Sequence, residues 1–157
     1  MPQSCGRTGA GKEHVKEMNH ILNSDIDSLL EILSRERHIL DDLQGRMREA
    51  GALMATEREG ALASAARQIA EVEKQLGTAE MLRAVVVAGI AERWGIPEYD
   101  LSLRSIIKRV PDGQAEALSR DLDHLREITR SIDSLRCSTA SAARRRLEIA
   151  HLATDSV

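Results

Sequence analysis

One stripe of apolar residues constrains the fold of this chain more than any other feature of its sequence. Ten positions in the first third of the chain alternate in spacings of four and three, and all but one are apolar: Leu22, Ile26, Leu29, Leu33, Glu36, Leu40, Leu43, Met47, Ala50 and Met54. A 3.5-residue repeat keeps one face of a helix against a partner helix along its whole length. The stripe therefore predicts a long helix that packs on other helices.

The rest of the composition agrees with an all-α protein. Hydrophobic residues make up 42% of the chain, yet Trp94 and Tyr99 are its only aromatic residues. Sheets are enriched in aromatic and β-branched residues, whereas Ala, Leu, Arg and Glu, which dominate here, favour helices. The net charge is −3 and the one basic cluster is Arg144–Arg146, a poor match for a phosphate backbone. We therefore expect no nucleic-acid binding.

The glycine-rich start of the chain matches only part of the sequence pattern of a phosphate-binding loop. Gly6–Lys12 matches Gly-x4-Gly-Lys, but Glu13 follows where a P-loop has Ser or Thr, and no buried strand precedes it. Residues 1–20 also lack an apolar period, so we expect them to be disordered. The longest apolar run, Ala84–Ala91, is much shorter than the roughly 20 residues that cross a bilayer, and we expect no membrane insertion.

Local signals divide residues 21–153, the expected helical bundle domain, into four helices. Ser24 is a candidate N-cap, Thr56 and Glu59 match a capping box, and Gly95 followed by Pro97 is a stop signal. Ser102 can cap a short connector helix. The helices are expected at residues 25–54, 57–94, 103–110 and 113–152. The alternative at the first break is one unbroken helix through Gly51 and Gly60.

Each long helix has its own stripe, so we predict a long antiparallel three-helix, coiled-coil-like bundle with a short connector helix. At 1.5 Å per residue the last helix is about 60 Å long and the first about 45 Å, so the last helix is expected to project past the bundle. Glu36 interrupts the first stripe. It is either an edge residue paired with an Arg of a neighbouring helix or a buried polar residue that fixes register.

Catalytic and metal-binding patterns are missing from the sequence. No two of the five His residues are spaced by four, and none joins a Cys at ligand spacing. Cys5 and Cys137 are far apart, which predicts free thiols in a reducing cytoplasm. No Gly-x-Ser-x-Gly elbow occurs. We therefore expect no enzymatic activity, no catalytic residues, no metal and no cofactor.

Three segments resemble the FlgN-type family of flagellar export chaperones. Leu29–Leu40, with Arg-Glu-Arg at its centre, is similar to the Leu-rich opening of the family, especially its actinobacterial branch. Glu80–Val85 resembles the same branch in its second helix. Trp94–Glu98 followed by Leu101–Leu103 resembles its Leu-Gly-Leu-Pro-Glu connector. The resemblance covers about residues 20–150.

This resemblance implies a cytoplasmic chaperone of flagellar type III secretion. Such proteins bind hook–filament junction proteins before export and deliver them to the export apparatus. The family's partner-binding helix is the last one, which here carries Ile128, Ile132, Leu135, Ala142, Leu147, Ile149 and Leu152. The chain departs from the family at Ser138–Ala143, where many members have Asn residues.

Two alternatives remain open from the sequence. Leu147, Ile149 and Leu152 either form the partner-binding surface or complete the bundle core. The chain as a whole is either a chaperone or a homodimeric coiled-coil adaptor that pairs through the first stripe and has no secretion client. The oligomeric state is open as well, because the same stripes can be satisfied within one chain or between chains.

Overall fold

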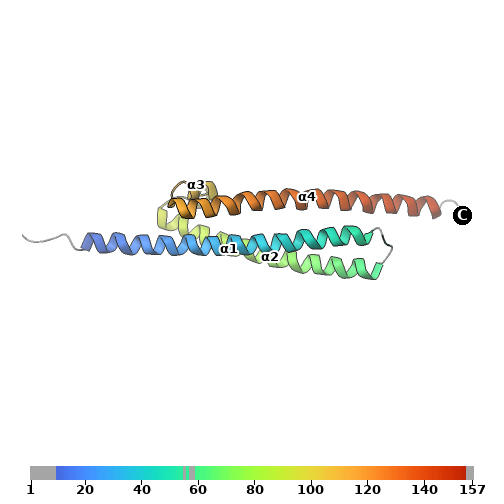
Figure 1. Cartoon of the computed structure of the whole chain (residues 1–157), viewed down its shortest axis with the longest axis horizontal. Coiled ribbons are helices and arrows are strands. Elements are labelled where there is room, and N and C mark those ends of the chain that lie inside the picture. Colours follow the sequence, from blue (N-terminus) through green and yellow to red (C-terminus); the bar gives the residue numbers. More distant parts are fainter. Residues whose placement is uncertain (1–9, 55, 57–58, 155–157) are drawn as a thin grey trace, which may run out of the picture.

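The computed structural model describes residues 10–54, 56 and 59–154, and the side chains of residues 23–54, 56 and 60–148. This part of the chain is helical and contains no strand. Its elements are α1 (Ala10–Met54), α2 (Glu59–Trp94), the 3-10 helix η1 (Glu98–Asp100), α3 (Leu103–Ile107) and α4 (Asp112–Thr154). α2 runs back along α1, and α4 runs in the same direction as α1 (Figure 1). The predicted all-α bundle with a short connector helix is confirmed.

α1 is the central helix of the bundle. α2 and α4 both pack against it, whereas the described parts of α2 and α4 make no close backbone contact with each other. The α1 stripe meets apolar side chains of both neighbours in one core. Its apolar members in this core are Ile26, Leu29, Leu33, Leu40, Leu43 and Met47, which lie with Val72 and Ile90 of α2 and with Leu118, Leu125, Ile128 and Ile132 of α4. The described residues of the first stripe thus pack mostly against other helices of the same chain.

The connection from α2 to α3 follows the predicted stop and start signals. Gly95 has a φ of 62°, and the amides of Gly95 and Ile96 donate to the carbonyls of Glu92 and Ala91. This is the Schellman arrangement, which satisfies the last carbonyls of a helix. Ser102 caps α3, since its hydroxyl accepts from the amide of Ser105 at 3.2 Å. α3 ends at Ile107, so the predicted end at residue 110 is too late.

The start of α1 differs from its prediction. The helix begins at Ala10 rather than at residue 25, and Ser24 lies inside it, where its carbonyl accepts from the hydroxyl of Ser28 at 2.9 Å. Residues 12–18 contain strong helix formers and no Pro, which allows the helix to extend through the expected N-cap. Part of the segment predicted as disordered is therefore helical. Residues 1–9, which hold most of the Gly6–Lys12 motif, lie outside the described residues.

The break between the first two helices is confirmed. α1 ends at Met54 and α2 begins at Glu59. The amide and hydroxyl of Thr56 both donate to the carbonyl of Leu53, at 3.0 and 2.9 Å. Thr56 therefore closes the turn after α1. The predicted capping box between Thr56 and Glu59 involves residues 57 and 58 and the side chain of Glu59, which lie outside the described residues. The break lets α2 fold back on α1, so that both helices bury their stripes.

Candidate partner-binding site

The residues of the predicted partner-binding helix fall into two groups. Ile128 and Ile132 are buried against α1, and Leu135 is half-buried at the edge of the same core. Ala142 is half-buried, whereas Leu147 is 62% exposed. The side chains of Ile149 and Leu152 lie outside the described residues. The structure thus places the first predicted residues in the core and Leu147 on the surface.

The sequence of α4 explains this division. Its first half presents large apolar side chains to α1, and Ile132 is the last of them that is buried in the described part of the chain. From Cys137 to Ala143 the helix has only small side chains. Small side chains remove little apolar area from water, so they stabilise the packing of this half much less. We call residues 135–148 the α4 tail.

Two arginine contacts hold the α4 tail to the bundle. Arg136 Nη2 donates to Glu73 Oε1 of α2 at 3.0 Å. Arg146 Nη1 donates to the carbonyl oxygen of Met54, the last residue of α1, at 2.7 Å. An Arg beside the final carbonyls of a helix satisfies groups that the helix leaves unpaired. Both contacts are exposed. An exposed ion pair such as Arg136–Glu73 contributes only about 0–1 kcal/mol, and a single hydrogen bond such as that of Arg146 about 0.5–1.5 kcal/mol. α4 continues past the end of α1, as its length predicts (Figure 1).

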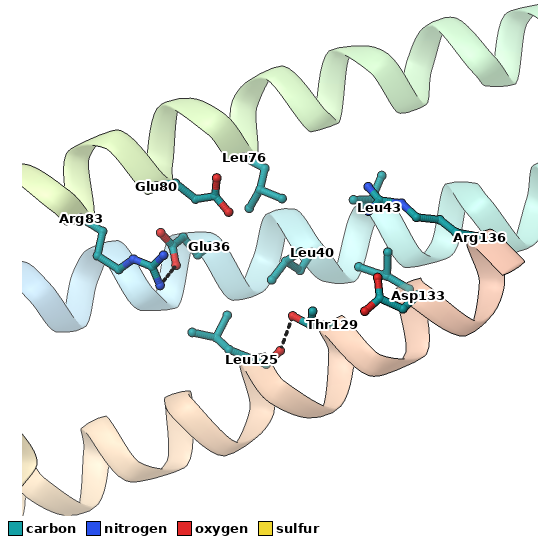
Figure 2. Close-up of a pocket in the computed structure, with 11 residues that line it drawn as sticks. Glu36, Leu40, Leu43, Leu76, Glu80, Arg83, Leu125, Thr129, Asp133 and Arg136 are labelled. Atoms are coloured by element: carbon teal, nitrogen blue, oxygen red, sulfur yellow. Dashed lines mark hydrogen bonds and ion pairs between the residues drawn. The ribbon is translucent and has the colours of Figure 1, made fainter. Parts of the chain in front are cut away.

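An open groove lies between α2 and α4 over α1, and we call it the α2–α4 groove. It encloses about 260 Å³. Its lining combines apolar side chains with acidic and basic ones from all three helices: Glu36, Leu40, Leu43, Leu76, Glu80, Arg83, Leu125, Thr129, Ile132, Asp133 and Arg136 (Figure 2). Glu80 and Asp133 make no ion pair with another described residue. The groove therefore has a partly apolar floor and unpaired carboxylates on two walls.

Glu36 lies at the base of this groove. Only 2% of it is exposed, and its Oε2 forms an ion pair with Arg83 Nη1 of α2 at 3.2 Å (Figure 2). Its other oxygen, Oε1, has no hydrogen-bond partner in the described part of the chain. Burial raises the pKa of the Glu36 carboxyl; Arg83 opposes this rise and Glu80 adds to it. The predicted pairing with an Arg of a neighbouring helix is confirmed, but the residue is buried rather than at the edge of the stripe.

The contact between α1 and α4 includes polar pairs that the sequence did not reveal. Arg37 Nη1 donates to Asp121 Oδ1 at 3.1 Å, and Gln44 Nε2 donates to Ser131 Oγ at 2.6 Å. His124 Nε2 lies 3.4 Å from Asp41 Oδ1 of α1. Asp121 is buried between Leu118 and Leu125, at helical spacing from both. That spacing is the signal that could have identified it, because a carboxylate on an apolar face needs a partner.

Comparison with known proteins adds no assignment: no family model, curated protein or solved structure matches the chain. Among the described helices, none combines the length and the apolar character needed to span a membrane. In the same residues, no group of three or more His, Cys, Asp or Glu side chains is arranged to hold a metal ion. The assignment of the candidate site therefore rests on the geometry of the groove and the α4 tail.

Proposed function

We propose that this chain is a cytoplasmic export chaperone of the FlgN type that binds hook–filament junction proteins through the C-terminal part of α4 before their export. The motifs at Leu29–Leu40, Glu80–Val85 and Trp94–Leu103 support the proposal by their resemblance to that family. The arrangement of long helices around α1 is compatible with it. In this proposal the chain binds a protein client and catalyses no reaction.

The weakly held α4 tail is the observation that carries the proposal. Its apolar contact with the bundle is small, it is fixed by two exposed arginine contacts, and Leu147 faces solvent. An amphipathic helix of a client can pack on such a surface with apolar residues at helical spacing. Because few native contacts must be broken, a shift of the tail toward a client costs little free energy.

The α2–α4 groove extends this surface and indicates the chemistry of the client. Arg136 is both part of the groove lining and the first anchor of the tail. Glu80 and Asp133 are available on opposite walls, so a client segment with a Lys or Arg beside its apolar face complements the groove. A client helix that covers the tail and enters the groove would bury Leu147 and pair these carboxylates.

Co-purification with a hook–filament junction protein from the same genome tests the proposal. We expect the full chain to form a stoichiometric complex, and a chain that ends at Ser134 to lose it while remaining helical by circular dichroism. Ile132 is retained in the shorter chain, so its core is preserved. If the full chain forms no complex, the proposed function is wrong; if the truncated chain binds equally well, the site lies elsewhere.

Point variants of the full chain separate binding from folding. Leu147→Glu places a charge at the centre of the proposed client contact, and we expect it to weaken the complex. Tyr99→Glu is the matched control, since Tyr99 is 88% exposed in η1, far from the tail (Figure 1). Both variants are expected to unfold as the native chain does, because neither side chain contributes to the core.

A further inference from the structure

α2 carries a second stripe on the face that points away from α1. Its six positions are spaced by four, three, four, three and four residues: Lys74, Thr78, Met81, Val85, Ala88 and Glu92. Met81 and Val85 at its centre are each 69% exposed, and Leu82 beside them is 43% exposed. The spacing is that of a coiled-coil seam. Five of the six positions are exposed, and Ala88 is half-buried. We call it the outer α2 stripe.

The surrounding sequence shows that this face is unusually apolar for a solvated helix. Residues 84–91 contain no polar side chain, and α1 covers only the side of this segment that bears Ile90 and Ala91. A helix that is apolar on all sides is normally buried on all sides. An exposed apolar seam of this kind indicates an interaction surface.

The charges at the two ends of the outer α2 stripe indicate which molecule can bind to it. The stripe has Lys74 at one end, Glu92 at the other and apolar residues between them, so it is complementary to itself when reversed. We propose that two copies of this chain associate through antiparallel α2 helices along the outer α2 stripe. In this register Met81 lies opposite the partner's Val85, Thr78 opposite the partner's Ala88, and Lys74 opposite the partner's Glu92.

The charges at the two ends select the antiparallel arrangement. In a parallel pair Lys74 would face a second Lys74 and Glu92 a second Glu92, which is repulsive at both ends. In the antiparallel pair the two-fold axis generates two equivalent contacts, each between Lys74 of one copy and Glu92 of the other. Lys74 and Glu92 are exposed and make no ion pair with another described residue, so both are available. The seam of 19 residues is about 28 Å long.

This interface leaves the proposed client surfaces open. The outer α2 stripe lies on the side of α2 opposite to α1, whereas α4 packs on α1 and makes no close backbone contact with α2. A dimer built this way therefore presents two copies of the α2–α4 groove and two α4 tails. The proposal does not depend on the chaperone assignment, because it rests on α2 alone and its test needs no client.

Light scattering combined with charge reversal tests the register. We expect the native chain to be a concentration-dependent dimer, and Lys74→Glu and Glu92→Lys each to weaken the dimer about tenfold or more, since each places like charges at both ends. An equimolar mixture of the two variants should dimerise again, because both pairs then have opposite charges. Lys108→Glu, an equal change at an exposed site off the stripe, is the control and should keep the native mass.

Met81→Glu addresses the apolar centre of the same seam. Met81 is largely exposed in the single chain, so this variant should keep its helical circular dichroism while losing the dimer. A native chain that stays monomeric at every concentration overturns the proposal. So does a dimer that survives Met81→Glu, or a dimer for which mixing the two charge variants restores no association.

Discussion

The two halves of α4 belong to one continuous helix but are held to the bundle by different interactions. The first half buries Leu118, Leu125, Ile128 and Ile132 against α1. The α4 tail presents small side chains to the same neighbour and is anchored through Arg136 and Arg146 at the surface. A helix can therefore be continuous although its packing against the bundle changes along its length. In this chain the change falls where large apolar residues give way to small ones.

The largest expected effect is the difference in stability between leucine-to-alanine variants in the two halves of α4. Leu118→Ala removes a side chain that is 1% exposed, and we expect it to lower the free energy of unfolding by about 2–5 kcal/mol. Leu147→Ala should change it by only about 0.5 kcal/mol or less, because that side chain is already in water. Denaturant titration measures both. Similar losses for the two variants would contradict the division of α4.

A pH-dependent effect is expected in the groove beside the first half. Burial raises the pKa of Glu36 above its ordinary value of 4.5, with Arg83 opposing and Glu80 adding to the shift. The folded chain therefore holds this proton more tightly than the unfolded chain. Its stabilising effect is complete below pH 4.5 and is lost as the pH rises through the raised pKa.

Glu36→Gln removes this titration while keeping the size of the side chain. As the pH is raised from acid to neutral, the unfolding free energy of the variant should increase relative to that of the native chain. The expected gain is about 1.4 kcal/mol for each unit by which the pKa is raised. Denaturant titrations across this range measure it, with Glu116→Gln on an exposed part of α4 as the matched control. A gain in the opposite direction would show that the pair with Arg83 outweighs burial.

The smallest expected effect concerns the anchor at the end of the tail. Arg146→Ala removes the bond to the carbonyl of Met54, and we expect a loss of about 1 kcal/mol or less in global stability. Amide exchange is the sharper measurement, because local opening lowers protection without global unfolding. Amides of residues 139–148 should exchange faster in the variant, while those of residues 118–132 should keep their protection. Arg145→Ala, which leaves the bond to Met54 in place, is the control.

Much of the fold was predictable because its signals are local. Gly95 and Ser102 act through hydrogen bonds within a few residues, and both caps were predicted correctly. The start of α1 was missed because Ser24 has the features of a cap, yet the residues before it also favour a helix. Arg83 could not be chosen as the partner of Glu36, since the contact joins two helices and no local pattern selects among the arginines.

The candidate site was less predictable than the fold. Periodicity alone could not separate Ile128 and Ile132, which are buried, from Leu147, which is not. The assignment of these residues to a client stays a prediction. The α2–α4 groove was not foreseen, because its lining comes from three helices that only the fold brings together.

The sequence by itself determined the long helices, most of their ends, and which face of each is apolar, because periodicity and capping depend on neighbours within about two turns. Only the tertiary structure decided how those faces are covered. It placed α1 between α2 and α4, paired Glu36 with Arg83, and left the α4 tail and the outer α2 stripe exposed. The physical reason is that an apolar stripe requires burial but does not specify which helix provides it.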